Sequence, residues 1–291
     1  MRVLVLGAGG YVGSALTERL AAAGHEVVAL ARSGGKSVPG AAEVRVGDLA
    51  DPASLTAAVT PDIDAVVHAA TPSGDAGVDA AAVEALTAPL RGSGRAFVYT
   101  SGVWVLGATG DAAADEDAAT RPIPIVGYRP EIERRVLDTA ADGVRAAVVR
   151  PGIVHGRGSG IPAMLVRWAA EDGAPRLVGD PAVRWPMVHV DDLADLFLAV
   201  LTDAPAGTVW HGVSETAVPV RDLAVAAGRA AGVKGEPRVW TVEQAAGELG
   251  GPFAEALALD QSVSSRLTRD RLGWNPSRPG SVADLGEGSY A

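Results

Sequence analysis

The first half of the chain alternates short apolar runs with longer segments of helical periodicity. The apolar runs occupy 2–6, 26–30, 42–48, 64–70, 95–101 and 145–152, and the helical segments occupy 11–23, 52–59, 79–91 and 130–141. Strands that are apolar at almost every position are typical of a parallel sheet covered by helices on both faces. The pattern therefore predicts an α/β fold built on a doubly wound parallel sheet.

The pattern changes near residue 155. Gly and Pro interrupt the second half more often, the expected helices are shorter, and five of the six tryptophans lie there. We predict a larger domain over residues 1–155, to which 187–213 returns, and a smaller C-terminal lobe formed by 156–186 and 214–291. Within the returning segment, 189–201 is predicted to be a helix capped by Asp191.

The longest predicted loop is 107–122, and it is rich in acidic residues. It is either a solvated surface loop or a flap that covers a site. The apolar N-terminus is interrupted by glycines, which favours a strand, a turn and a helix over a signal peptide. No apolar run is long enough to span a membrane. We expect a cytoplasmic protein, and the oligomeric state stays open between a monomer and a homodimer.

Composition narrows the classes of function. The formal net charge is -10, and the basic residues form no long run, which argues against nucleic acid or an anionic membrane as the partner. The absence of cysteine excludes disulfides, thiolate catalysis and cysteine-ligated zinc. A small-molecule substrate is the remaining expectation.

The stretch "VLVLGAGGYVGSAL" carries the strongest local signal. Gly7, Gly10 and Gly13 follow the first strand at three-residue intervals, Gly9 is extra, and a helix begins directly afterwards. Glycine permits the tight turn, the close approach of a pyrophosphate and close helix–strand packing. The start of the helix supplies amide donors for phosphates. These features predict a dinucleotide-binding turn.

Two further positions bear on the cofactor. The second strand ends in Arg32 and Ser33, where a carboxylate would bind the ribose 2′-hydroxyl of NAD. A guanidinium suits a phosphate, so we expect NADP(H), with NAD(H) less favoured; the alternative is a surface arginine. Asp51 precedes Pro52 and is the expected cap of the next helix, which leaves Asp48 available either for a ligand or for a turn.

The pieces "GAGGYVG", "GDLADP", "VVHAATP", "VYTSGVWVLG", "VVRPGIVHG" and "RWPMVHVDDLA" occur in one order across nearly the whole chain. In this the chain resembles the short-chain dehydrogenase/reductase superfamily, in its extended or atypical branch, the NAD-dependent epimerase/dehydratase-like group. The resemblance implies a Rossmann fold with a C-terminal substrate-binding lobe. It says little about the substrate.

The resemblance also implies roles for single residues. Gly7, Gly10, Tyr11 and Val12 would cradle the pyrophosphate, Asp48 and Leu49 would flank the adenine, Ala69 and Ala70 would lie along the cofactor, and Pro151 and Ile153 would lie near the nicotinamide. The usual catalytic hydroxyl position is occupied by Gly102. Thr100 or Ser101 would therefore have to bind the substrate oxygen.

The catalytic Tyr-x-x-x-Lys pair of that superfamily is missing. The residue four after Tyr128 is Ile132, and aligning "ERRVL" on the usual helix puts Arg129 in the lysine position and Ile125 in the tyrosine position. Pro130 predicts that the helix starts there, with Tyr128 in the preceding loop. Arg129 can bind a ribose or a substrate oxygen but stays charged. Tyr128 is either the catalytic acid or a loop residue at the edge of the cleft.

Histidines were considered as alternative acids and as ligands. His155 stands where the family usually has tyrosine and is a reserve acid, whereas His68 is expected to be structural. No histidine forms a metal spacing with carboxylates, so no metal site is predicted. Trp104, Trp168, Trp185 and Trp210 either line a pocket or belong to the core.

These observations lead to one expected function and two alternatives. We expect an NADP(H)-dependent oxidoreductase that acts on a carbonyl or another unsaturated small molecule, with a secondary metabolite as one option. The proton would come from Tyr128, His155 or water. An epimerase, dehydratase or isomerase on the same frame is the first alternative. A non-catalytic NADP(H)-binding regulator is the second, since the tyrosine–lysine pair is absent.

Overall fold

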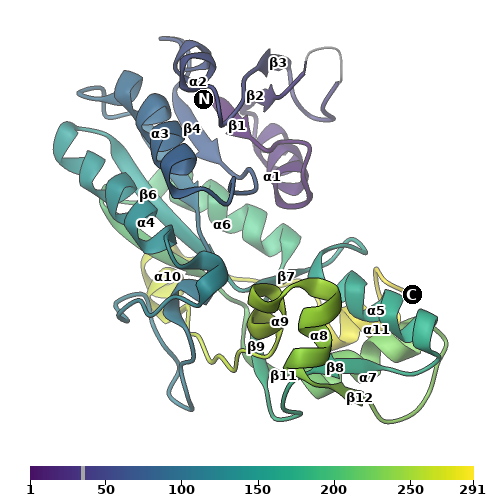
Figure 1. Ribbon diagram of the computed structural model, residues 1–291. Helices are drawn as coiled ribbons and strands as arrows, with labels where there is room; N and C mark the ends of the chain where they lie inside the picture. The colour runs from purple at the N-terminus through teal and green to yellow at the C-terminus, as the bar shows by residue number, and fades with distance from the viewer. Residues whose placement is uncertain (34–36) are drawn as a thin grey trace.

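The computed structural model describes residues 1–33 and 37–291, and it contains the predicted parallel sheet (Figure 1). The sheet has seven strands in the order β10-β6-β5-β4-β1-β2-β3, and every neighbouring pair is parallel. Its strands are β1 (Arg2–Leu6), β2 (Glu26–Ala31), β3 (Glu43–Val46), β4 (Ala65–His68), β5 (Ala96–Thr100), β6 (Arg145–Pro151) and β10 (Thr208–Gly212). The predicted doubly wound α/β fold is confirmed.

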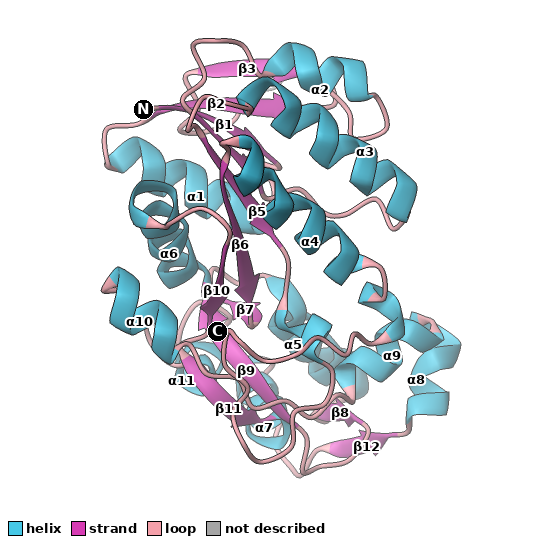
Figure 2. Cartoon of the chain, turned by 90° about the vertical axis from the view of Figure 1, so that its left-hand side faces the viewer, coloured by secondary structure: helices cyan, strands magenta, loops and turns pink. Residues whose placement is uncertain are grey.

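Helices cover both faces of this sheet. They are α1 (Tyr11–Ala22), α2 (Pro52–Ala58), α3 (Ala76–Thr87), α4 (Arg129–Asp138) and α6 (Val190–Asp203), with short 3-10 turns at η1 (Ala88–Leu90), η2 (Val103–Leu106), η3 (Pro124–Val126) and η4 (Thr139–Asp142). In Figure 2, α1 and α6 lie on one side of the strands, and α2, α3 and α4 lie on the other. Alternate strand residues face each side, so two apolar cores form.

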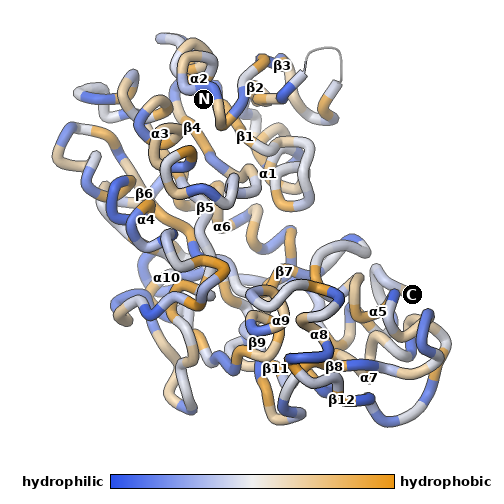
Figure 3. Tube along the Cα trace, viewed as in Figure 1, coloured by the Kyte–Doolittle hydropathy of each residue, from blue (hydrophilic) through white to orange (hydrophobic). Residues whose placement is uncertain are grey.

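The C-terminal lobe has its own core and its own small sheets. Its elements are β7 (Ile153–His155), α5 (Gly160–Asp172), β8 (Arg176–Val178), β9 (Arg184–His189), β11 (Glu215–Pro219), α7 (Val220–Ala230), β12 (Arg238–Trp240), α8 (Val242–Leu249), α9 (Gly251–Leu257) and α11 (Ser281–Glu287). The strands form β11-β9-β7 and β12-β8. Hydrophilic positions gather on outer parts of this lobe, such as α8 and the end of β12 (Figure 3).

The segment 187–213 divides between the two parts of the molecule. Its first residues complete β9 in the three-stranded sheet, whereas β10 pairs with β6 at the edge of the large sheet and α6 packs beside α1. The predicted cap of α6 is wrong. The helix is capped by His189, whose Nδ1 accepts from the Asp191 amide, because Asp191 is already inside the first turn.

The acidic loop 107–122 is docked rather than free at its centre. The Ala114 amide donates to the Ser262 carbonyl, and the Ser264 amide donates to the Ala114 carbonyl. Glu116 is buried, and its Oε1 accepts from the amide and hydroxyl of Thr268, which lies on α10 (Arg266–Leu272). Asp111 and Asp117 are exposed, so the expectation of solvated loop residues holds for these two acids but not for Glu116. No residue of 107–122 lines the cavity described below, so the segment is not a flap over it.

Among the helices in the described parts of the chain, none has both the length and the apolar character needed to cross a bilayer.

Candidate functional site

A cavity of about 1100 Å³ opens at the carboxyl ends of β1, β2, β4 and β5. This edge is where ligands bind in open parallel α/β sheets. Of the residues expected to contact a cofactor or substrate, its lining includes Gly7, Gly10, Tyr11, Val12, Arg32, Asp48, Leu49, Ala69, Ala70, Thr100, Ser101 and Arg129. The remaining lining comes mainly from residues 37–39, 47–50 and 71–73. The structure thus brings together most of the residues that the sequence indicated.

The glycine turn has the close packing that a pyrophosphate cradle requires. Gly7 has a φ of +77°, and a Cβ there would lie 2.7 Å from the Ala69 carbonyl oxygen. A Cβ on Gly13 would lie only 1.9 Å from the Gly7 carbonyl oxygen, so α1 can approach the turn only with glycine at this position. Gly10 is the N-cap of α1 and lines the cavity with Gly9. The amides that open α1 therefore border the cavity.

The end of the cavity beside β2 and β3 is bordered by Arg32 and by Asp48. Asp51 caps α2 through its side chain, as predicted. Asp48 Oδ1 accepts from the Ala50 amide at 2.9 Å, so this carboxylate also shapes the turn. Ser33 does not line the cavity, although it was expected to bind the cofactor with Arg32.

The end of the cavity beside β5 and α4 is formed by Thr100, Ser101 and Arg129. Thr100 Oγ1, Ser101 Oγ and Arg129 Nε are buried and have no hydrogen-bond partner within the described residues. Arg129 Nη2 donates to the Thr100 carbonyl at 2.6 Å and lies 3.4 Å from Tyr99 Oη. The tip of the guanidinium is thus fixed on β5. The two hydroxyls and Nε remain as polar groups that a bound oxygen can satisfy.

Tyr128 is adjacent to this site but does not line the cavity. It is the N-cap residue of α4, which begins one residue earlier than Pro130 predicted, so Arg129 is helical rather than in the loop. Tyr128 Oη donates to Asp79 Oδ2 at 2.7 Å. Burial and the hydrogen bond to this carboxylate raise the pKa of Tyr128 to about 12. Tyr128 thus lies beside the cavity with its hydroxyl on Asp79, and its role as the acid stays a prediction.

Asp79 is a residue of the site region that the sequence reasoning missed. It lies in the first turn of α3, which begins at Ala76 rather than at 79 because Asp75 caps it. Asp79, Ala82, Val83 and Leu86 are all buried on one helical face. A charged residue within that apolar face was the available signal, because a buried carboxylate needs partners.

His68 ends β4 and is buried, as expected. Its ring meets the Tyr99 ring edge-on, with 5.4 Å between the ring centres. Burial lowers the pKa of His68 to about 4, and the nearby Asp79 carboxylate opposes this shift only in part. His68 is therefore neutral near pH 7 and belongs to the packing beneath the site.

His155 does not lie in the cavity, contrary to its proposed place as a reserve acid. It is completely buried, with Asp284 of α11 and His189 at the start of α6 beside its ring. Its Nδ1 is 3.0 Å from Asp284 Oδ2. Pro151 and Ile153 are likewise absent from the lining, since Ile153 packs into the core of the lobe. Their expected contacts with the nicotinamide have no support in this cavity.

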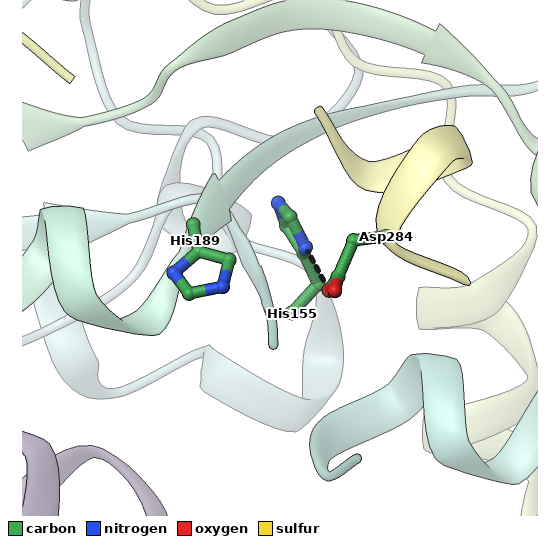
Figure 4. A group of neighbouring side chains, drawn as sticks. All are labelled: His155, His189 and Asp284. Carbon is green, nitrogen blue, oxygen red and sulfur yellow. Dashed lines mark hydrogen bonds and ion pairs between the residues drawn. The ribbon is translucent and has the colours of Figure 1, made fainter. Parts of the chain in front are cut away.

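His155, His189 and Asp284 form a group that the sequence spacing did not indicate (Figure 4). One ligand-type atom from each lies within 4.8 Å of the others. Hydrogen bonding already accounts for this arrangement: His189 Nδ1 accepts from the Asp191 amide, and Asp284 Oδ1 accepts from the Ser289 amide. A neutral His189 that accepts at Nδ1 carries its proton on Nε2 and cannot ligate there. We interpret the group as a hydrogen-bonded connection between β7 and α11.

The tryptophans resolve into core residues and one residue near the cleft. Trp168, Trp185 and Trp210 are buried in the apolar cores. Trp104 is half-buried and meets Phe253 of α9 edge-on, with 6.4 Å between ring centres. None of these four lines the described cavity.

Comparisons with known proteins agree with this geometry. A model of the NAD dependent epimerase/dehydratase family matches residues 3–211. The chain is similar to an uncharacterised protein, C2A9.02, from Schizosaccharomyces pombe, with 32% identity over 100% of both chains. It is 31% identical to the 2-alkyl-3-oxoalkanoate reductase of Stenotrophomonas maltophilia, over 77% of this chain and 73% of that protein.

A solved structure shows the same fold over the full length. The crystal structure of the human epimerase family protein SDR39U1 (isoform 2) with NADPH has a TM-score of 0.79 to this chain, 25% identity and 99% coverage of each chain. The matched segment of the family model includes the glycine turn, β5 with its hydroxyls and the first turn of α4. The chain therefore belongs to the NAD-dependent epimerase/dehydratase family.

Proposed function

We propose that this protein is an NADP(H)-dependent oxidoreductase that acts on the carbonyl group, or another unsaturated carbon, of a small molecule. One observation carries the proposal. Thr100 Oγ1, Ser101 Oγ and Arg129 Nε are buried without partners, and all three residues line the same cavity that the glycine turn borders. Unsatisfied buried polar atoms are costly, and a bound oxygen would satisfy them.

The cavity fits a nicotinamide dinucleotide. The turn at Gly7 leaves no room for a side chain, and the amides that open α1 border the space where phosphates would lie. Arg129 borders the opposite end, where it can bind the ribose or the substrate. When bound, the cofactor supplies the hydride or accepts it.

The residues of the chain supply positioning and electrostatic stabilisation. Thr100 and Ser101 donate to the substrate oxygen and hold its carbonyl at the end of β5. Arg129 stabilises negative charge as it develops on that oxygen, and it does so without moving a proton. A hydroxyl or a water molecule then delivers the proton. Tyr128 is not needed for this step.

Two of the comparisons support the proposal that the protein is a reductase. The relative from Stenotrophomonas maltophilia is named a reductase of 2-alkyl-3-oxoalkanoates, and the human structural neighbour was solved with NADPH. A carbonyl substrate and NADPH are therefore reasonable starting points. We propose a small molecule as the partner and neither nucleic acid nor a membrane.

Cofactor choice is tested by calorimetry with NADPH and NADH. Arg32 lines the adenine end of the cavity, so NADPH should bind more tightly and Arg32→Asp should reverse the order. Arg238→Asp is the matched control, because Arg238 is an exposed residue of β12 outside the cavity. Tighter binding of NADH by the unmodified protein would show that Arg32 does not select the phosphate.

Activity is tested by following NADPH absorbance with a panel of ketones and 3-oxo acids. The variant with both Thr100→Val and Ser101→Ala should lose about 100-fold or more in hydride transfer, because two donors to the developing oxyanion are removed. NADPH binding with no consumption on any carbonyl compound would favour the regulator. Conversion of a substrate with no net change in NADPH would favour the epimerase or isomerase.

A further inference from the structure

Asp79 is a buried carboxylate beside the candidate site to which the proposed chemistry assigns no role. Its side chain bridges two segments that are distant in the sequence. One oxygen accepts from the Ser73 amide at 2.9 Å, and the other accepts from Tyr128 Oη at 2.7 Å. Ser73 belongs to the wall of the cavity, and Tyr128 immediately precedes Arg129.

The carboxylate is held as an anion inside the protein. Burial raises the pKa of Asp79, but the hydrogen bonds from Ser73 and Tyr128 outweigh it and hold the pKa below its usual value. Within the described residues, the side chain of Asp79 contacts the Ser73 amide and the Tyr128 hydroxyl and forms no ion pair with a lysine or arginine. An anion that is only 4% exposed and has no cationic partner is costly to retain. The Ser73 amide and the Tyr128 hydroxyl, both neutral donors, therefore stabilise the Asp79 carboxylate.

The start of α4 depends on this contact. No side-chain hydrogen bond caps the helix at Tyr128. Arg129, the next residue, lines the cavity and keeps its guanidinium on the Thr100 carbonyl. The bond from Tyr128 Oη to Asp79 ties this first turn to α3, and the bond from Ser73 ties the cavity wall to the same carboxylate.

We infer that Asp79 is a positioning residue, which holds Arg129 and the cavity wall at residues 69–73 at a fixed separation through Tyr128 and Ser73. The inference rests on the proposed function only where hydride transfer is the readout. It has a second consequence. The single hydroxyl hydrogen of Tyr128 is directed at Asp79 rather than at the cavity, so Tyr128 orients the site and does not donate the proton.

The test is a double-mutant cycle on Asp79→Asn and Tyr128→Phe, measured by NADPH fluorescence titration and thermal unfolding. Each single variant should weaken NADPH binding by about fivefold, the usual effect of one lost hydrogen bond. The double variant should be no weaker than Asp79→Asn, because Tyr128→Phe removes only the hydrogen bond to a carboxylate that this variant already lacks. Glu84→Gln, an exposed change on the same helix, is the control and should leave affinity unchanged.

Three outcomes would overturn the inference. Independent effects that multiply in the double variant would show that the two residues do not act together. Lowered melting temperature with unchanged NADPH affinity in all three variants would show a purely structural contact. A third outcome needs a carbonyl substrate: if Tyr128→Phe alone loses about 100- to 10,000-fold in hydride transfer while Asp79→Asn loses little, Tyr128 is the acid.

The binding arm keeps this inference separate from the proposed function. NADPH affinity can be measured whether or not any carbonyl compound is reduced. A protein that binds NADPH, shows the coupled loss of affinity and reduces nothing would retain the positioning role of Asp79 while refuting the oxidoreductase. A protein that reduces a ketone but shows no coupling between the Asp79 and Tyr128 variants would support the oxidoreductase and refute the positioning role of Asp79.

Discussion

Substituting alanine at two glycines of the first turn separates a role in ligand binding from a role in folding. Gly10 has φ −83° and ψ 176°, which alanine adopts freely. A Cβ at Gly10 would meet a single atom, the Gly7 carbonyl oxygen at 3.1 Å. The cost to the free protein should therefore be below about 1 kcal/mol. The same methyl group would project from the N-cap of α1, where a pyrophosphate has to approach the backbone.

Gly13 should give the opposite result. Its Cβ would lie 1.9 Å from the Gly7 carbonyl oxygen and 2.6 Å from the Gly7 carbonyl carbon. Both atoms belong to the backbone of the turn, so the overlap can be relieved only by separating α1 from β1. We expect Gly13→Ala to lower the free energy of unfolding by at least about 3 kcal/mol, at the upper end for overpacking a core.

The assay pairs urea unfolding with NADPH titration. Gly10→Ala should unfold like the unmodified protein and bind NADPH at least about tenfold more weakly, which is about 1.4 kcal/mol. Gly247→Ala is the control, since a Cβ there meets nothing within 4 Å and α8 lies in the other lobe. If Gly10→Ala binds NADPH normally, the phosphates do not approach the turn and the pyrophosphate cradle is refuted.

Two further predictions concern buried ionisable groups. Burial lowers the pKa of His68 to about 4 in the folded state, against about 6.5 when unfolded, so the contribution of His68 to the free energy of unfolding should be constant above pH 7 and fall by about 2 kcal/mol at pH 5. Urea unfolding of His68→Gln should therefore show a loss between pH 7 and pH 5 that is smaller by this amount than in the unmodified protein. An identical pH dependence in the two proteins would contradict the assignment. Glu133 and Arg150 form a buried ion pair at 2.6 Å. Glu133→Gln should lower the free energy of unfolding by about 3–5 kcal/mol, because it leaves the Arg150 guanidinium buried without a counter-charge. A change below about 1 kcal/mol in urea unfolding would show that other groups satisfy the guanidinium.

The sheet was predictable because its signals are local. Each strand of the large sheet is a short apolar run. The turn after β1 carries three glycines within residues 7–10, and Gly13 follows in the first turn of α1. Helix ends were less accurate: α3 begins three residues before the predicted position, because the capping carboxylate of Asp75 was not recognised. The start of α4 was placed within one residue, because Pro130 restricts it directly.

The contacts missed by the sequence analysis join residues that are far apart along the chain. Tyr128 and Asp79 are separated by 49 positions, and His155 and Asp284 by 129. No local periodicity records such pairs, so His155 could be placed near the cleft by its motif while its ring is buried against α11. The docking of Glu116 on Thr268 was missed for the same reason, since an acidic loop gives no indication of the donor that it meets.

The groups at the end of β5 are suited to stabilising negative charge on an oxygen. Among the residues that line the cavity there, Thr100, Ser101 and Arg129 offer two hydroxyls and a guanidinium, and a guanidinium does not accept a proton. The nearby carboxylate, Asp79, already accepts hydrogen bonds from Ser73 and Tyr128. Under the proposed function, an oxyanion develops in carbonyl reduction and, by microscopic reversibility, in alcohol oxidation as well, so these groups would assist both directions. The direction of net turnover would then follow the ratio of reduced to oxidised cofactor and the substrate supplied, not the residues at the end of β5.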